Sequence, residues 1–454
     1  MSKQVTNSSS SQFRSRLGLI AATVGSAVGL GNIWRFPAET QAGGGAAFLL
    51  IYILCVALLG IPVMVAEFSL GRAGHTDAIG AFGRVTPGKR GWRWVGVMSV
   101  LTAFLISVFY MVVTGWTFEY LWGSLSGNLY SSATPDFSAK MTEYVATPVL
   151  PVVFTVLAVA LNMAVLLGGV QKGIERLSNI LMPLLFVILL ILCGVALTLP
   201  GAGAGLEFFL KPDFSHVGPM TWLRALGQAF FSLSLGMGIL VTYAGYYPAK
   251  TRLVRTAVTV SLLDMLVAVL VGFIIFPAVT SFGLQDSGLE GTTLVFVTLP
   301  EVFTRLPGGP VWSVMFFLLL SIAALTSTVS ITEVTTRCLQ DRFGLSRRRA
   351  VLTVMLPLFV LSGVCALSPG PLDRARIFDR NMFDFLDFLT ADFLLPVASL
   401  GLCIYMGWVA PRQLLRDEMT NYGADRSLLF KPILFIVRYL APVMIVLVLI
   451  SPLL

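Results

Sequence analysis

Two short stretches of the sequence combine glycines with hydroxyl or amide side chains inside apolar segments. They are 25–32 (GSAVGLGN) and 232–238 (SLSLGMG). A glycine inside a helix costs about 1 kcal/mol relative to alanine, so these stretches predict two interrupted helices. At an interruption, freed carbonyl oxygens can coordinate a cation, and the amides that begin the next half-helix can bind an anionic group. Close packing of unbroken helices is the alternative, because glycine also occurs at helix contacts in membranes.

Asp264 is a further candidate, because it lies well inside the apolar segment 254–281. A carboxylate near the middle of a bilayer costs about 2.5–3.5 kcal/mol on insertion scales, and such a residue seldom lacks a partner. No basic residue lies at membrane depth on the same segment. Two interpretations stay open: a cation-binding carboxylate, or a protonated Asp with a structural hydrogen bond.

The composition shows which elements must position these residues. Of the 454 residues, 56% are hydrophobic and 12% are charged, and the mean hydropathy is +0.85. An average soluble domain carries about 25% charged residues, so soluble globular, disordered and nucleic-acid-binding classes are excluded. The composition indicates an integral membrane protein. The five cysteines and two histidines are scattered, so we expect packing roles for the cysteines and no haem, zinc or di-iron centre.

Eleven apolar segments are each long enough to cross a bilayer core of about 30 Å. Residues 1–16 are polar and predict a cytoplasmic tail without a secretory signal. Residues 17–410 predict a ten-helix core of two repeats, 17–198 and 219–410, that each begin with an interrupted helix. Residues 411–454 add a cytoplasmic loop and an eleventh helix. The predicted fold is an all-α polytopic membrane protein with spans at 17–41, 46–71, 94–125, 147–167, 174–198, 219–245, 254–281, 311–338, 349–368, 384–410 and 432–453.

The distribution of basic residues predicts the orientation of the chain. With the N-terminus in the cytoplasm, most of the 31 lysines and arginines fall on cytoplasmic segments, as the positive-inside rule requires. The net charge of +8 therefore reflects topology and not a nucleic-acid-binding surface. An odd number of spans leaves the C-terminus outside, and 285–308 is expected to hold a short helix within a loop.

Three motifs resemble those of one transporter family. The run 29–37 (GLGNIWRFP), followed by glycines at 43–45, closely resembles the first-helix signature of the neurotransmitter:sodium symporters. The run 228–236 resembles the sixth-helix signature of that family, and 325–327 (LTS) its eighth-helix sodium motif. The resemblance extends over about 16–408. Within the family, the chain resembles bacterial members that transport leucine or several hydrophobic amino acids. It implies an inverted five-helix repeat with discontinuous helices 1 and 6, although most members have twelve spans.

The resemblance implies two sodium sites built mostly from uncharged oxygens. The first uses the Ala27 carbonyl, the Asn32 side chain, Ser232, a residue on the seventh helix and the carboxylate of the substrate. The second uses the carbonyls of Gly25, Val28 and Ala323. The hydroxyls of Thr326 and Ser327 complete it. Without the resemblance, hydroxyls inside membrane helices often bond back to the preceding turn.

The implied substrate is a hydrophobic amino acid, aromatic ones included. Family members that transport monoamines carry an Asp where this chain has Gly29, whereas amides near Leu30 and Gly31 suit a carboxylate. Tyr110 resembles the tyrosine that binds the same carboxylate, with a core tyrosine as the alternative. Met237 lies between two glycines, which favours an adaptable pocket. The implied substrate residues are Ala27, Gly29, Leu30, Gly31, Ile106, Tyr110, Phe231, Ser232, Ser234, Met237 and Ile331.

The resemblance also implies a gate on each side of the membrane. Arg35 and Asp387 form the outer ion pair, for which Asp384 and Asp392 are alternatives. Asp341 matches the cytoplasmic gate acid, whose expected arginine is out of register, so that Arg14 or Arg16 takes its place.

Two features of the backbone add expectations for the cytoplasmic side. Glu67 is expected either to accept hydrogen bonds from freed amides of the interrupted helices or to lie solvated at a helix end. Gly173 and Pro183 frame a segment of the fifth helix that can unwind to admit water to the second sodium site, or can form a static kink.

The chloride requirement of animal members is expected to be absent. Tyr52, Gln228 and Ser232 match chloride-site positions, but Asp264 stands where a sodium-binding Asn is expected and Ala268 where a chloride-binding Ser would be. An Asp264 carboxylate that binds sodium would also supply the negative charge that chloride brings elsewhere.

Three other functions are alternatives to sodium symport. Proton-coupled amino-acid transport on the same scaffold is the main alternative, and the hydroxyl and carbonyl ligands argue against it. A membrane-embedded enzyme would need a reactive constellation such as HExxH, which the sequence lacks. A channel fits poorly with two interrupted helices. The expected partners are an amino acid, sodium and the bilayer of the cell membrane, with no nucleic acid.

Overall fold

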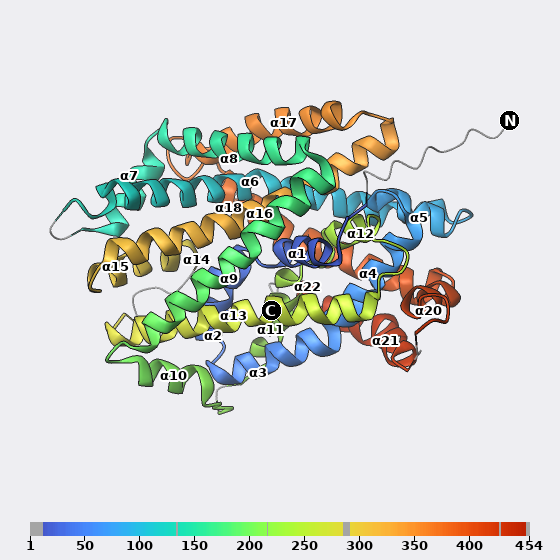
Figure 1. Cartoon of the computed structure of the whole chain (residues 1–454), viewed down its shortest axis with the longest axis horizontal. Helices are drawn as coiled ribbons and strands as arrows, with labels where there is room; N and C mark the ends of the chain where they lie inside the picture. The colour runs from blue at the N-terminus through green and yellow to red at the C-terminus, as the bar shows by residue number, and fades with distance from the viewer. Residues whose placement is uncertain (1–11, 133–134, 216, 285–290, 426–427, 451–454) are drawn as a thin grey trace.

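The computed structural model describes residues 12–132, 135–215, 217–284, 291–425 and 428–450. Long helices run roughly along the longest axis of the molecule and pack side by side (Figure 1). Within the described ranges there is no β-strand, and extended pairing is limited to one bridge between Ile377 and Arg380. The all-helical fold that the composition predicted is confirmed.

Nine helical spans among the described residues are unbroken, apolar and long enough to cross a membrane. Each overlaps a segment that the hydropathy pattern predicted. They are Ala46–Gly74 (α3, η3 and α4), Arg90–Ser126 (η4 and α6), Leu150–Leu167 (α8), Val170–Leu197 (η6 and α9), Leu253–Ser281 (α13), Gly309–Phe343 (α16), Arg347–Leu367 (α17), Met382–Val409 (α18, η8, α19 and η9) and Phe430–Ile450 (α21, η10 and α22).

The two remaining predicted segments are the interrupted ones. The first divides into Arg16–Ala27 (α1) and Gly31–Ala42 (η2 and α2), which are bent by 52°. The second divides into Pro219–Ser232 (α11) and Ile239–Ala244 (α12), neither of which is long enough to span a membrane alone. The predicted interruption of both helices is confirmed.

Glycine conformation explains the second interruption. Between α11 and α12 the backbone turns through positive φ angles at Ser234 (54°), Gly236 (79°) and Gly238 (73°). Residues other than glycine seldom adopt this left-handed region. Glycine does so without a steric clash, which favours the sharp turn at two of the three positions.

Several short helices connect the spans. The expected loop helix is present as Gly291–Thr304 (α14, η7 and α15). Others went unpredicted because eight to ten residues carry too little periodicity: Ala78–Val85 (α5), Phe137–Ala146 (α7), Ala202–Leu210 (α10) and Arg412–Met419 (α20). The Asp77 carboxylate caps α5 by accepting from the amides of Ile79 and Gly80.

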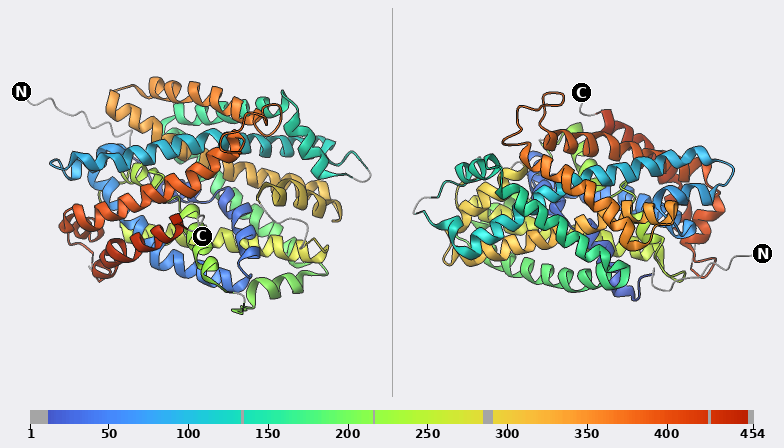
Figure 2. Two further views of the ribbon diagram at one scale, coloured as in Figure 1. Left: turned by 180° about the vertical axis from the view of Figure 1, so that it is seen from behind. Right: turned by 90° about the horizontal axis from the view of Figure 1, so that it is seen from above.

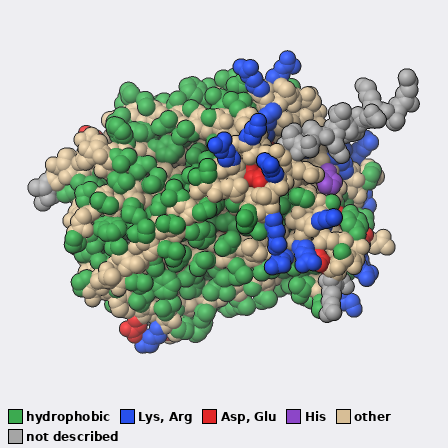
Figure 3. Space-filling view, viewed as in Figure 1, with side chains coloured by type: hydrophobic (Ala, Val, Ile, Leu, Met, Phe, Trp, Pro, Cys, Tyr) green, Lys and Arg blue, Asp and Glu red, His purple; other side chains and the backbone are tan. Residues whose placement is uncertain are grey.

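The surface separates by polarity as a membrane protein requires. Figure 3 shows apolar side chains across most of the visible face, with Lys and Arg gathered toward the end that holds α5, α20 and α21 in Figure 1. The last long span lies on the outside of the bundle beside α19, as the rear view in Figure 2 shows.

The loop before this last span is fixed to the core. Arg72 of α4 forms an ion pair with Glu418 of α20, and both side chains are only 3% exposed. The Arg72 guanidinium also donates to the Thr251 carbonyl (2.5 Å) and to Asn421 Oδ1 (3.0 Å). Part of the segment 411–454, which was expected to hold a loop and an eleventh helix, is thus bound to the core through Arg72.

Candidate substrate and ion site

The two helix interruptions lie against each other inside the bundle. The Ser234 hydroxyl donates to the Ser26 carbonyl at 3.0 Å, and the Gln228 side-chain amide donates to the Gly31 carbonyl at 3.1 Å. All four residues are buried. Segments about 200 residues apart in the sequence therefore form one irregular region, which is tolerated in a membrane only where protein or a cavity surrounds it.

A small cavity of about 320 Å³ lies at this junction. All of the predicted substrate residues line it except Leu30, which is buried beside it. Sequence reasoning missed Ser26 as a substrate-side residue and assigned Ser327 only to an ion site. The lining residues are Ser26, Ala27, Gly29, Gly31, Ile106, Tyr110, Phe231, Ser232, Ser234, Met237, Ser327 and Ile331.

Glycines let the backbone itself form part of the cavity wall. A Cβ atom at Gly29 would lie 2.6 Å from the Ser327 hydroxyl and 3.4 Å from that of Tyr110. At Gly31 it would lie 2.9 Å from the Phe231 ring. Side chains at these positions would fill the space, so the cavity exposes main-chain groups. None of the lining side chains carries a charge.

A buried carboxylate forms the centre of a polar cluster beside the cavity. Asp264 of α13 is completely buried and accepts from Asn32 Nδ2 (2.8 Å) and from the Ser232 hydroxyl (2.6 Å). Asn32 Oδ1 in turn accepts from the Gly29 amide at 3.1 Å. The Tyr52 hydroxyl lies 3.4 Å from that of Ser232. Oxygen atoms from four separate spans therefore converge in one cluster.

The residues implied for the second sodium site converge on the other side of the first interruption. The Ser327 hydroxyl donates to the carbonyls of Val28 (3.2 Å) and Gly25 (3.4 Å). The Thr326 hydroxyl instead bonds back to the Ala323 carbonyl at 3.1 Å on its own helix. In this structure the Thr326 hydroxyl therefore bonds back to the preceding turn of its own helix, whereas the Ser327 hydroxyl donates to another span.

The predicted outer ion pair is not in direct contact among the described residues. Arg35 pairs with Glu39 one turn along the chain (3.7 Å), and its guanidinium lies 4.7 Å above the Phe231 ring. Asp387 is near enough for an electrostatic interaction with Arg35 and lines a separate cavity. The Arg35 guanidinium therefore lies over the Phe231 ring, which lines the junction cavity, and not against the Asp387 carboxylate.

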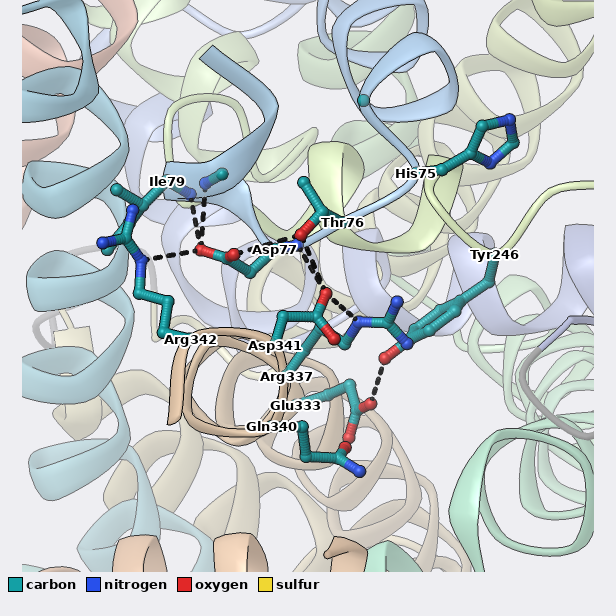
Figure 4. A network of polar contacts seen from close by, with 12 residues as sticks. His75, Thr76, Asp77, Ile79, Tyr246, Glu333, Arg337, Gln340, Asp341 and Arg342 are labelled. Carbon is teal, nitrogen blue, oxygen red and sulfur yellow. Dashed lines mark hydrogen bonds and ion pairs between the residues drawn. The ribbon is translucent and has the colours of Figure 1, made fainter. Parts of the chain in front are cut away.

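The inner acid has a different partner from the one predicted. Asp341 pairs with Arg337, one turn earlier on the same helix, at 2.7 Å, and accepts from the Thr76 hydroxyl and the Asp77 amide (Figure 4). The expectation that Arg14 or Arg16 supplies the arginine is wrong for this structure, because α16 provides it locally.

The N-terminal segment is instead bound by another acid. Glu175 accepts from the amides of Arg14 (2.8 Å) and Ser15 (3.0 Å) and from the Ser15 hydroxyl. Phe13 is buried in edge contact with Tyr243, with ring centroids 5.7 Å apart. Sequence reasoning missed Glu175, although an acidic residue between Lys172 and Arg176 was a usable signal.

Two predictions concern the backbone near the second interruption and on the fifth span. The Glu67 carboxylate accepts from the Gly236 amide at 2.7 Å, so the contact with a freed amide is confirmed. The segment around Gly173 and Pro183 is helical in this structure: Gly173 lies in a π-helical turn and Pro183 inside α9. Unwinding of this segment stays a prediction.

The model of the Sodium:neurotransmitter symporter family matches residues 10–148 and 147–454. The chain belongs to this family. It is 36% identical over 437 residues to the sodium-dependent transporter YhdH of Bacillus subtilis, covering 96% of both chains. It is 34% identical over 454 residues to a sodium-dependent transporter of Haemophilus influenzae, covering 96% of this chain and 97% of the relative.

A solved structure of the family has the same fold. The crystal structure of MhsT in complex with L-phenylalanine superposes with a TM-score of 0.88 at 41% identity, covering 97% of this chain and 99% of MhsT. As a member of this family the chain is a sodium-dependent membrane transporter and not an enzyme.

Proposed function

We propose that the chain is a symporter that uses the sodium gradient to move hydrophobic L-amino acids, aromatic ones included, into the cell by alternating access. The observation that carries this proposal is the uncharged cavity that the two helix interruptions enclose. The relative crystallised with L-phenylalanine supports an aromatic substrate.

The proposed binding mode follows from the two kinds of wall in the cavity. The substrate carboxylate meets the amides of Leu30 and Gly31, at the start of a half-helix, and the Tyr110 hydroxyl. The apolar side chain lies among Ile106, Met237 and Ile331, which are buried, and Phe231, which is half-buried. The hydroxyls of Ser232 and Ser234 face the polar part of the ligand.

Two sodium sites are proposed beside the substrate. The first combines the Ala27 carbonyl with Asn32, Ser232, Asp264 and the substrate carboxylate. The second combines the carbonyls of Gly25, Val28 and Ala323 with the hydroxyls of Thr326 and Ser327. Hard oxygen ligands of this type suit hard cations, and the shared carboxylate makes sodium and substrate each bind better when the other is present.

Chloride independence is part of the same proposal. Asp264 places a fixed carboxylate within hydrogen-bond distance of Asn32 and Ser232, and Ala268 offers no hydroxyl to chloride. A permanent negative charge at this point replaces the one that a bound anion would supply.

The gates are assigned to the two ends of the central path. On the outer side we assign Arg35, whose guanidinium lies over the Phe231 ring, together with Asp387, which is near enough to interact with it electrostatically. On the inner side we assign Asp341 with Arg337. Unwinding of the segment between Gly173 and Pro183 is proposed to open a water path to the second sodium site.

The proposed topology has eleven spans, with the interrupted pair α11 and α12 counted as one. The five-helix repeats are inverted, the N-terminus is cytoplasmic and the C-terminus is outside the cell membrane. The concentration of basic side chains at one end of the molecule supports this orientation.

Uptake into proteoliposomes tests the function directly. Radiolabelled amino acids are scanned with an inward sodium gradient, with choline replacing sodium as the control, and with protein-free liposomes as the blank. We expect sodium-dependent uptake of phenylalanine and leucine that persists when a proton uncoupler is added. Uptake that ignores sodium but collapses with the uncoupler would establish the proton-coupled alternative instead.

A further inference from the structure

An arginine lies among aromatic side chains on the outer surface of the last span. Arg438 belongs to the π-helical turn η10 (Ile436–Leu440), and its guanidinium carbon lies 3.9 Å from the Trp408 ring centroid and 5.5 Å from that of Tyr439. Tyr439 also contacts Trp408 and Phe435, each with centroids 5.4 Å apart. We call these four residues the Arg438 cluster. Its three aromatic residues are 45–60% exposed on the bundle surface, where lipid surrounds the protein.

The neighbouring span fixes the depth of the cluster in the membrane. Trp408 is the second-last residue of the span Met382–Val409, at its basic end. A Cβ atom on Gly407 would lie 2.8 Å from the Arg438 Cα, so the two backbones touch at the same level. Tryptophan and tyrosine concentrate where the bilayer meets water, at the level of the headgroups. Arg438 is the ninth residue of the 21-residue span Phe430–Ile450, level with the end of the neighbouring span, and from there its long side chain extends toward the lipid phosphates.

Arg438 has no anionic partner within the described protein. No described carboxylate lies within 4.0 Å of its guanidinium, and its Nε is enclosed without a hydrogen-bond acceptor. A basic residue in a membrane span is normally paired, because an isolated charge is costly there. The ring contacts satisfy only the faces of the guanidinium. Its N–H groups still form a fork that matches a phosphate group.

The backbone on both sides of the cluster is adapted to this contact. The π-helical turns η9 (Tyr405–Val409) and η10 pack against each other. The Trp408 indole N–H donates to the Arg438 carbonyl at 3.0 Å, which fixes the ring under the guanidinium. Single π-helical turns often occur at functional positions in helices.

We propose that the Arg438 cluster is a binding site for the headgroup phosphate of an anionic phospholipid, in the leaflet on the basic side of the molecule. Charge complementarity identifies the occupant, since the unpaired Arg438 guanidinium is complementary to the negatively charged headgroups at a membrane surface. The site lies outside the substrate and ion cavity and does not depend on the proposed function. Only its assignment to the cytoplasmic leaflet rests on the proposed orientation.

Lipid retention measured by native mass spectrometry tests the site on the purified full-length chain. Phosphatidylglycerol, phosphatidylcholine and inorganic phosphate are titrated against the native protein, Arg438→Gln and Arg348→Gln. Arg348 is the matched control, because it is exposed at the start of α17 on the same basic end. We expect the native protein and Arg348→Gln to retain phosphatidylglycerol about tenfold more tightly than phosphatidylcholine. Arg438→Gln should lose this preference, since a charge-assisted hydrogen bond is removed.

Two further variants keep the test decisive if Arg438→Gln does not fold. Arg438→Lys keeps the charge without the planar fork, and Trp408→Ala removes the ring beneath it. Both should weaken phosphatidylglycerol retention severalfold and reduce its preference over phosphatidylcholine. An unchanged preference in all the cluster variants would overturn the proposal. So would inorganic phosphate that displaces phosphatidylglycerol at equal concentration, because the site would then recognise a free anion and not a lipid.

Discussion

Asp264 is the one acidic side chain among the proposed sodium ligands. Its two oxygens bind Asn32 and Ser232, and no charged side chain lines the adjacent cavity. Uptake by the native protein should be unchanged when gluconate replaces chloride at constant sodium. Asp264→Asn should lower uptake at least tenfold, because it removes a full charge from a buried ion site.

A second variant separates the loss of charge from misfolding. If Asp264→Asn combined with Ala268→Ser regains activity only in chloride, the anion has replaced the missing carboxylate. A severalfold fall in native uptake without chloride would contradict the assignment. Normal elution of each variant in size-exclusion chromatography is the folding control.

A variant in each of the two proposed sodium sites should change the sodium dependence of uptake. Asn32 binds the Asp264 carboxylate directly, whereas Thr326 bonds back to its own helix. Asn32→Ala should raise the sodium concentration for half-maximal uptake by about tenfold or more, since hydrogen bonds to charged groups contribute about 1.5–3 kcal/mol. Thr326→Val should raise it as well, because it removes one proposed ligand of the second site.

The measurement is uptake of labelled phenylalanine across a sodium titration. Ser321→Ala is a suitable control, because its buried hydroxyl contacts Thr117 and is not among the proposed ion ligands. Wild-type sodium dependence in both site variants, with normal folding, would refute the assigned ligands.

At the scale of the element, the fifth span is the one with a built-in weak point. Gly173 lies in a π-helical turn, and Pro183 inside α9 removes one backbone hydrogen bond. We expect amide exchange over 174–182 to increase when sodium is removed, because the second site would then lose the ion that stabilises the closed helix. Hydrogen exchange with mass spectrometry measures this, and 351–360 in α17 serves as the reference segment.

A variant of the same span sharpens the test. Pro183→Ala restores the missing donor and should reduce the sodium-dependent difference in exchange. Equal exchange over 174–182 with and without sodium would leave the segment as a static kink.

At the scale of the whole molecule, Arg72 joins three parts of the chain on the side that the proposed topology assigns to the cytoplasm. It pairs with Glu418 of α20 and binds the backbone between α12 and α13. Breaking a buried ion pair on one side costs about 3–5 kcal/mol, because the remaining charge loses its partner. Arg72→Ala should therefore lower the thermal unfolding temperature clearly in detergent.

An exposed ion pair in the same region provides the matched control. Arg252 and Asp425 lie 3.2 Å apart, with the arginine side chain 60% exposed, so Arg252→Ala should cost less than about 1 kcal/mol. Equal melting temperatures for the two variants would show that the Arg72 contacts do not hold α20 to the core.

The sequence by itself determined the membrane class, most span positions and the two helix interruptions, because apolar length and clustered glycines act locally along the chain. It also identified nearly every residue that lines the cavity, through motifs that keep their spacing. Only the tertiary structure decided which charged side chains meet. Asp341 pairs with Arg337 and not with the N-terminal arginines, Arg35 covers Phe231, and Glu175 holds Arg14 by its backbone. The packing of helices that are distant in the sequence determines which long charged side chains come into contact. No local sequence pattern predicts these pairs.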